Sequence, residues 1–284
     1  MLGAGGQLGQ ALARTAPSRH EVIARTRAEL DIADAAAVRR ESAELRPDWI
    51  LNAAAYTQVD RAEDEPARAA AINDAAVGTL AQAAASASSR LVHLSTDFVF
   101  DGAANRAYRP DDATRPLSVY GTSKRDGEIR ALEADCGAIV LRTAWVYACA
   151  GRNFVLTMLR LMREREQVRV VSDQIGTPTW ARGLACAVWD LVDGAAPSGI
   201  YHWTDLGVAS WYDFAVAIQD EALERGLLQR AASIEPIGTA EYPTRARRPA
   251  FSVLDTSATR ERVTTPALHW RHHLRMMLDE LRTE

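Results

Sequence analysis

The sequence contains almost no lysine. Of its 33 basic residues, 32 are arginines and only one, Lys124, is a lysine. The basic residues form no block and the formal net charge is -4, so we expect neither nucleic acid nor an anionic membrane as a partner. The longest apolar runs, such as residues 50–55 and 138–141, are far too short to cross a bilayer.

Cysteine is also scarce. Cys136, Cys149 and Cys186 lie far apart and form no C-x-x-C pair and no Cys/His cluster. We therefore expect reduced thiols in a cytoplasmic protein, and no metal site. No signal peptide is expected, because a glycine-rich motif begins at the third residue.

The first half of the chain has a regular alternation, in which short β-branched runs are separated by alanine-rich stretches of helical character. Strands buried on both faces and separated by helices predict an α/β fold, a doubly wound Rossmann-type parallel sheet. Ligands of such sheets bind at the carboxyl ends of the strands. We expect strands at 21–24, 49–53, 90–94, 138–142 and 168–171, and helices at 7–15, 35–45, 66–86, 119–134, 154–163 and 180–192.

The second part of the chain differs in composition. After about residue 192, proline, glycine and large aromatic residues become more frequent, and helices no longer follow strands regularly. We therefore expect residues 1–145 to form a dinucleotide-binding domain, with returns of the chain near 165–195 and 231–254. Residues 146–284 are expected to form a smaller, interleaved substrate-binding lobe.

Gly3, Gly6 and Gly9 form a G-x-x-G-x-x-G motif at the start of the first expected helix. Glycines permit a tight turn and a close approach of the backbone to a pyrophosphate, which binds at the helix N-terminus. An ordinary glycine-rich turn is the alternative. Only two residues precede Gly3, where a strand normally runs. Either the native start lies upstream, which we favour, or the sheet lacks most of its central strand.

Two further segments bear on the cofactor. Arg25 and Arg27 follow the second expected strand, where arginine suits the 2′-phosphate of NADP and an acidic residue would suit NAD. We therefore expect NADPH, with NADH left open and two solvated arginines as the alternative. The small residues Ala53 and Ala55 end the next strand and leave room for a cofactor, or simply allow helix packing.

Tyr120 and Lys124 form the sharpest signal. On a helix, positions four apart share one face, so the phenol and the amine point the same way. An adjacent ammonium is expected to lower the pKa of the phenol, which makes it a usable proton donor. The only lysine among 33 basic residues stands at this position. A compact ammonium fits where a planar guanidinium does not, which is a physical reason for the exception.

Taken together, these motifs resemble the dTDP-4-dehydrorhamnose reductase family of extended short-chain dehydrogenases/reductases. The resemblance covers nearly the whole chain. The segments that carry it are GAGGQLG (3–9), NAAAYTQVDRAE (52–63), STDFVFDG (95–102), VYGTSK (119–124), RTAWVY (142–147), DQIGTPT (173–179), WYDFA (211–215) and PTRARRP (243–249).

The resemblance implies reduction of the C4 keto group of dTDP-4-dehydro-L-rhamnose, giving dTDP-L-rhamnose. Tyr120 would donate the proton, and Lys124 would hold the nicotinamide ribose. Thr96 would bind the C4 oxygen, with Asp97 beside it on the substrate. Trp145 would pack against the sugar nucleotide, unless it is a core aromatic. The residues expected to contact the cofactor are Gly3, Gly6, Gln7, Leu8, Arg25, Asp31, Ile32, Ala53, Ala55, Tyr56, Thr57, Tyr120 and Lys124.

Arg245, Arg247 and Arg248 lie between two prolines. A rigid loop of this kind favours a bidentate contact of at least one guanidinium, Arg248 in our assignment, with the substrate diphosphate. A solvated charge cluster is the alternative.

Two other functions stay open at this point. An epimerase or dehydratase of another nucleotide sugar would need an extra acid/base pair, and no acidic neighbour completes one beside Thr96 and Asp97. A non-catalytic dinucleotide-binding subunit, like the regulatory subunit of methionine adenosyltransferase, would not need Thr96, Tyr120 and Lys124 together. We therefore favour an NAD(P)H-dependent reductase of a dTDP-sugar and leave a homodimer open.

Overall fold

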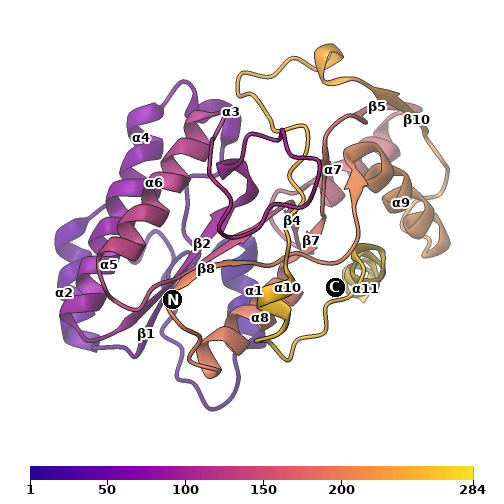
Figure 1. The fold of residues 1–284 in the computed structure, drawn as a ribbon. Helices are drawn as coiled ribbons and strands as arrows, with labels where there is room; N and C mark the ends of the chain where they lie inside the picture. The colour runs from indigo at the N-terminus through magenta and orange to yellow at the C-terminus, as the bar shows by residue number, and fades with distance from the viewer. Residues whose placement is uncertain (284) are drawn as a thin grey trace.

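The computed structural model describes residues 1–283, and its centre is a parallel β-sheet (Figure 1). The four strands follow the order β1-β2-β3-β8. Leu2 extends the sheet beyond β1 through single parallel bridges to Asn52 and Arg25. The strands are β1 (Trp49–Asn52), β2 (Arg90–Thr96), β3 (Ile139–Thr143) and β8 (Gly199–His202).

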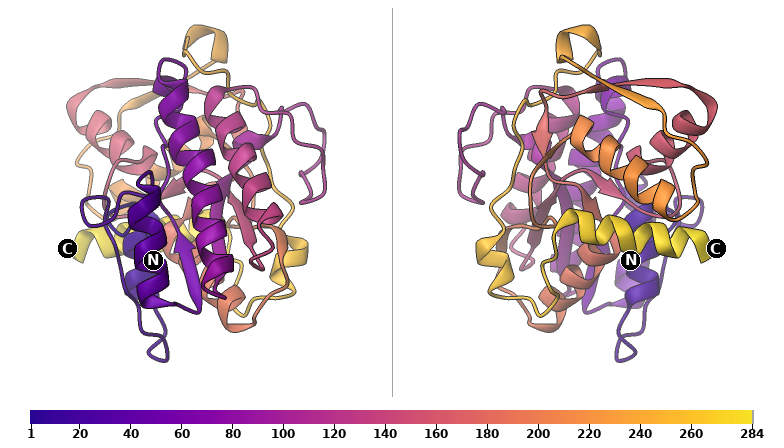
Figure 2. Two further views of the ribbon diagram at one scale, coloured as in Figure 1. Left: turned by 90° about the vertical axis from the view of Figure 1, so that its left-hand side faces the viewer. Right: turned by 90° about the vertical axis from the view of Figure 1, so that its right-hand side faces the viewer.

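Helices cover both faces of this sheet, because successive strand residues point to opposite sides. On one face, Leu51, Val92 and Leu141 pack with α1 (Gln7–Thr15) and α8 (Ala181–Asp193). On the other face, Ile50, Leu91 and Val140 pack with further helices. These are α2 (Ala35–Leu45), α5 (Ala76–Ser86) and α6 (Val119–Glu133), which lie side by side in the left view of Figure 2. The doubly wound α/β fold is confirmed.

The expected strand at 21–24 is wrong. Those residues form no strand, and only Arg25 makes a bridge, to Leu2. A strand needs a partner with which to exchange backbone hydrogen bonds, and here Met1 and Leu2 supply only two residues. The Arg25 amide donates to the carbonyl oxygen of Met1 at 2.8 Å, and the Ala4 amide donates to that of Arg25 at 3.0 Å.

The expected strand at 168–171 exists, but it lies outside the central sheet. β5 (Gln167–Val171) pairs in parallel with β10 (Ser233–Ile237) in a two-stranded sheet of its own. Beside it, α7 (Phe154–Glu164), α9 (Trp211–Glu224) and α11 (Trp270–Thr283) enclose a second apolar cluster that includes Phe214 and Trp270.

The remaining elements are short. The expected helix at 66–86 is one continuous run, but a π-helical turn, η1 (Ala71–Ala75), separates α4 (Pro66–Ala70) from α5. No helix within residues 1–283 has both the length and the apolar character that a membrane span needs. The other short elements are α3 (Val59–Ala62), η2 (Asp97–Val99), β4 (Val146–Tyr147), β6 (Ile175–Gly176), β7 (Thr179–Trp180), β9 (Ala209–Ser210), η3 (Thr239–Glu241) and α10 (Ser257–Arg260).

Candidate active site

The expected site residues gather at the carboxyl edge of the sheet. Parallel pairing sets Asn52 beside His93 and Thr96 beside Thr143, so the ends of β1, β2 and β3 meet at one edge. Trp145 follows β3 by two residues at the same edge. Ligands of open parallel sheets bind at this edge.

The start of α6 positions Tyr120. The Ser118 hydroxyl caps the helix by accepting a hydrogen bond from the Gly121 amide at 3.1 Å. The Glu63 carboxylate accepts from the Val119 amide at 2.9 Å, which places a negative charge at the positive end of the helix. A side chain at Gly121 would collide with the carbonyl oxygen of Phe98. The glycine therefore lets α6 approach η2 closely, beside Thr96.

Tyr120 is buried and lies against Thr96. It is 9% exposed and packs edge-on against Phe98, with ring centroids 5.6 Å apart. Burial raises the pKa of Tyr120 to about 12, and the nearby Asp97 also raises it. The Thr96 side chain is near enough to the phenol to favour its ionised form, which partly offsets burial. The expected lowering of this pKa by Lys124 is therefore wrong for this structure, because burial dominates.

Lys124 is one turn further along α6 and is 2% exposed. Its Nζ donates to the carbonyl oxygen of Leu94 at 2.6 Å and lies 3.3 Å from Nε2 of His93. Burial lowers the pKa of Lys124 to about 8, and Glu128 opposes that shift. The amine therefore makes its protein contacts with the sheet rather than with Tyr120.

Asp97 is also buried, next to Thr96 and Tyr120. Its Oδ1 accepts from the Thr96 hydroxyl at 3.0 Å, whereas its Oδ2 is buried without a partner within residues 1–283. Burial raises the pKa of Asp97 to about 6, against opposing hydrogen bonds from Ser252 and Thr96. Thr96, Asp97 and Tyr120 thus bring two hydroxyls and a carboxyl together, and their roles toward a substrate remain predictions.

The glycine-rich turn has the geometry that a dinucleotide needs. Gly3 has a φ of +78°, and a Cβ there would lie 2.6 Å from the amide nitrogen of Ala54. The small residues that follow β1 therefore serve a close backbone approach. A Cβ at Gly9 would collide with Gly3. α1 begins at Gln7 with Gly6 as its N-cap and without a side-chain cap, so its first N–H groups are available to an anion.

Other residues that were expected to contact the cofactor have the following contacts and burial. Gln7 accepts from the Asn153 amide at 2.9 Å, and Leu8 packs against the core beside α1. Tyr56 is buried and donates from its hydroxyl to Glu65 at 3.0 Å. Ile32 is buried, and Thr57 is exposed.

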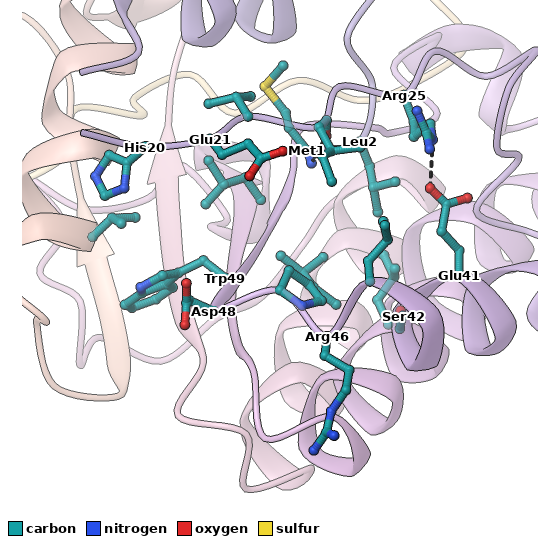
Figure 3. A pocket seen from close by; sticks show the side chains of 18 of the residues that line it. Met1, Leu2, His20, Glu21, Arg25, Glu41, Ser42, Arg46, Asp48 and Trp49 are labelled. Carbon is teal, nitrogen blue, oxygen red and sulfur yellow. Dashed lines mark hydrogen bonds and ion pairs between the residues drawn. The ribbon is translucent and has the colours of Figure 1, made fainter. Parts of the chain in front are cut away.

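Arg25 points to a carboxylate rather than to open solvent. Its Nε donates to Oε1 of Glu41 at 2.6 Å (Figure 3). Arg27 pairs in the same way with Asp31, at 3.2 Å. The contact of Arg25 with a cofactor phosphate remains a prediction, and the guanidinium would have to share its charge between that phosphate and Glu41.

A cavity of about 470 Å³ lies beside Arg25 (Figure 3). It is bounded by Met1, Leu2, residues 19–23 and residues 45–51, and it contains neither Thr96 nor Tyr120. It continues the line of Leu2 between residues 21–25 and β1. The cavity is therefore separate from the Tyr120 site.

Trp145 has an unusual backbone conformation, and its ring packs against a second aromatic ring. Its φ is +47°, which is strained for a bulky side chain. Its ring stacks on that of Trp211, with centroids 3.5 Å apart and planes 7° apart. A Cβ at Gly176 would lie 2.6 Å from the same ring. These contacts fix the orientation of Trp145, while its contact with a sugar nucleotide remains a prediction.

The loop that carries Arg248 is fastened to the residues after β1. Arg248 makes a bidentate pair with Asp60, at 3.1 and 2.7 Å, and Arg245 pairs with Asp64. Asp60 also accepts from the Ala246 amide at 3.1 Å. Arg248 thus lies over the segment that follows β1, and its contact with a diphosphate remains a prediction.

Sequence reasoning missed three groups of this site. Asn73, in the π-helical turn η1, donates to Ser123 of α6 at 3.1 Å and binds both backbone groups of Tyr56. A π-turn inside a long helix often marks a functional site, but the sequence shows only an alanine-rich run. His93 and the buried pair Glu128–Arg142 were also missed, because their partners come from distant segments.

Comparison with known proteins decides the family. The sequence model of the RmlD substrate binding domain matches residues 1–283. The chain is 40% identical to the dTDP-4-dehydrorhamnose reductase of Burkholderia thailandensis, over 98% of this chain and 97% of that protein. The chain belongs to the dTDP-4-dehydrorhamnose reductase family. The resemblance drawn from the motifs is thus confirmed.

Two further similar proteins extend the comparison. The spore coat polysaccharide biosynthesis protein SpsK of Bacillus subtilis is 43% identical, with 98% of this chain and 95% of that protein covered. The crystal structure of the dTDP-4-dehydrorhamnose reductase of Bacillus anthracis in complex with NADP is 32% identical. Its TM-score is 0.92, with 98% of this chain and 97% of that chain covered.

Proposed function

We propose that this chain reduces the C4 keto group of dTDP-4-dehydro-L-rhamnose to give dTDP-L-rhamnose, with NADPH as reductant and Tyr120 as proton donor. The observation that carries the role of Tyr120 is the burial of its phenol beside Thr96 at the carboxyl edge of the sheet. Family membership over residues 1–283 supports the reaction itself. NADH remains a second candidate reductant.

The chemistry needs a hydride and a proton on opposite ends of one carbonyl group. NADPH, when bound, supplies the hydride to C4. The C4 oxygen then becomes an alkoxide, which is a far stronger base than a phenolate, so Tyr120 can protonate it. The raised pKa of Tyr120 keeps the phenol protonated at neutral pH, which is the form that a donor needs. The Thr96 hydroxyl is placed to orient the same oxygen.

The residues at the glycine-rich turn fit a dinucleotide. The uncapped start of α1 offers backbone N–H groups to a pyrophosphate, and the glycines clear a path over the backbone. We assign the pyrophosphate to Gly6, Gln7 and Leu8. Lys124 is assigned to the nicotinamide ribose, because it is a buried amine on the same helix face as Tyr120.

The substrate is assigned to the second part of the chain. We propose that residues 1–145 bind the dinucleotide and that residues 146–284 bind the sugar nucleotide, with the chain returning near 165–195 and 231–254. Asp97 and Trp145 are assigned to the sugar and Arg248 to the diphosphate. Arg248 makes a bidentate pair with the carboxylate of Asp60, and a guanidinium can bind two oxygens of a diphosphate in the same way, which supports this assignment.

Two coarser proposals concern the setting. The three cysteines lie far apart in the sequence and form no C-x-x-C pair, which supports a cytoplasmic protein. A homodimer rests on the family resemblance alone, and light scattering during gel filtration tests it.

The reaction is tested by adding NADPH or NADH to the purified chain with dTDP-4-dehydro-L-rhamnose. We expect the absorbance of NADPH to fall and dTDP-L-rhamnose to form in equal amount. Consumption without this product would contradict the proposed substrate. Binding without turnover would favour a non-catalytic dinucleotide-binding subunit.

A further inference from the structure

Behind the active site, three buried polar side chains form a line that ends at Lys124. Asn52 at the end of β1 and His93 in β2 are both 0% exposed, and Lys124 is 2% exposed. Nδ2 of Asn52 lies 3.1 Å from Nδ1 of His93, and Nε2 of His93 lies 3.3 Å from Nζ of Lys124. Buried polar groups of this kind restrict one another's donors and acceptors.

The orientation of Asn52 is set by the backbone. The Ala54 amide donates to Oδ1 of Asn52 at 3.1 Å, which identifies that atom as the amide oxygen. The NH₂ group of Asn52 therefore faces His93. Because this group can only donate, Nδ1 of His93 must accept.

The N–H hydrogen of the His93 ring can then lie on only one of the two ring nitrogens. Burial, and secondly the charge of Lys124, hold the pKa of His93 well below its ordinary value, so the ring is neutral. A neutral imidazole with Nδ1 as acceptor carries its hydrogen on Nε2, which faces Nζ of Lys124. An amine has a lone pair that can accept this hydrogen, whereas an ammonium has none. Nζ meanwhile donates to the Leu94 carbonyl oxygen.

We propose that His93, oriented by Asn52, is a positioning residue for Lys124: it presents an N–H to Nζ and thereby favours the neutral amine over the ammonium. This proposal adds a positioning residue to the proposed reductase and rests on that proposed function. Tyr120 loses a proton in each turnover and must regain one. Lys124 in its ammonium form can return that proton to the phenolate and become a neutral amine, which the N–H of His93 stabilises, before it takes up a new proton from solvent.

The other charged groups around Lys124 do not reverse this preference. Glu128, one turn along α6, favours the ammonium, but its carboxylate is engaged by Arg142 at 2.9 and 2.7 Å and by the Ser95 hydroxyl. Asp97 and Tyr120 are also buried nearby, but neither is among the causes of the pKa shift of Lys124. The net effect is a pKa of Lys124 lowered to about 8, mainly by burial.

The single lysine allows a direct measurement. Growth with lysine labelled with ¹³C at Cε gives one side-chain resonance, whose pH titration reports Lys124 alone. We expect a midpoint near 8 in the unaltered chain. His93→Gln can turn its carbonyl oxygen toward Nζ, so the midpoint should rise by about one unit. His272→Gln, at an exposed position in α11, is the matched control and should leave the midpoint unchanged.

A second measurement needs no change in the pocket. In ¹⁵N-histidine spectra of the unaltered chain, one histidine should show the Nε2–H tautomer and fail to titrate between about pH 5 and 9. The isosteric Asn52→Asp replaces the donor by an acceptor and should move that hydrogen to Nδ1 and raise the midpoint of Lys124. An Nδ1–H tautomer for the histidine whose signals His93→Gln removes overturns the proposal, and so does a lysine midpoint that both variants leave unchanged. His202 is also buried, and its Nδ1 lies 3.1 Å from the carbonyl oxygen of Tyr108, so its Nδ1–H signal is expected in every variant. Neither readout requires turnover, so failure of the reductase assignment would be seen separately.

Discussion

The two ends of the proposed site are built differently. Around Tyr120, the side chains of Thr96, Tyr120 and Lys124 are each at most 9% exposed and contact one another or the sheet behind them. Around Arg25, the side chain is 33% exposed, pairs with Glu41 and borders a cavity. A buried side chain has few allowed orientations, so its neighbours are fixed by the fold. A surface arginine binds whichever carboxylate folding brings near.

Removing the Tyr120 hydroxyl, at the buried end of the site, should have the largest effect on activity. Tyr120→Phe keeps the ring that packs against Phe98 and deletes only the donor. We expect kcat to fall by roughly two to four orders of magnitude, with the Kd of NADPH little changed. Steady-state kinetics and a fluorescence titration check this. A variant with near-normal kcat would remove Tyr120 from the chemistry.

Lys124→Arg should be the next most damaging change, although it keeps the charge. Nζ lies 2.6 Å from the Leu94 carbonyl oxygen in a buried position, where a guanidinium would be overpacked. We expect kcat/KM to fall by about two orders of magnitude and unfolding to cost about 1–3 kcal/mol less free energy. Arg125→Lys on the same helix, at a more exposed position, is the control. Full activity of Lys124→Arg would show that charge alone is required.

A third prediction for the buried end concerns how the stability of the protein depends on pH through Asp97. Its pKa of about 6 lies above the ordinary 3.8, so its stabilising effect is complete below about pH 4 and is lost as pH rises through 6. Asp97→Asn removes this loss. We expect the variant to gain roughly 1–3 kcal/mol relative to the parent between pH 4 and pH 8. Urea unfolding at both pH values measures this gain. An equal difference at both pH values would mean that Asp97 titrates normally.

Trp145 lies between the two extremes, since it is partly buried and stacked on Trp211. Trp145→Ala should raise the KM of the dTDP-sugar by about tenfold and leave the Kd of NADPH unchanged, because the ring is expected beyond the cofactor. Trp49→Ala, in β1 beside the cavity, is the control for losing a tryptophan. If Trp145→Ala lowers thermal stability alone, the ring is only a core aromatic.

What the sequence could predict also depends on whether a signal is local or comes from distant segments. Helices α1 and α2 were placed to the residue, because caps and alanine-rich runs are local signals. Thr96, Asp97 and Tyr120 were expected at one site because of the family resemblance, and the strand ends and the start of α6 place them at one edge of the sheet. His93 was invisible, since its role depends on Asn52 and Lys124, which lie 41 residues before and 31 residues after it. The pKa of Tyr120 was misjudged, because burial cannot be read from spacing.

The smallest effect is expected at Arg25, and a pair of variants can show whether it belongs to the site. In Arg25→Gln, the ratio of kcat/KM for NADPH to that for NADH should fall by only a few-fold, because Glu41 already neutralises much of the charge. Glu41→Gln frees the guanidinium and should raise the same ratio. Opposite shifts in the two variants would place a phosphate within reach of Arg25. If neither variant moves the ratio, Arg25 only ties the segment after residues 21–24 to α2. The NADPH preference would then come from other residues of the dinucleotide site.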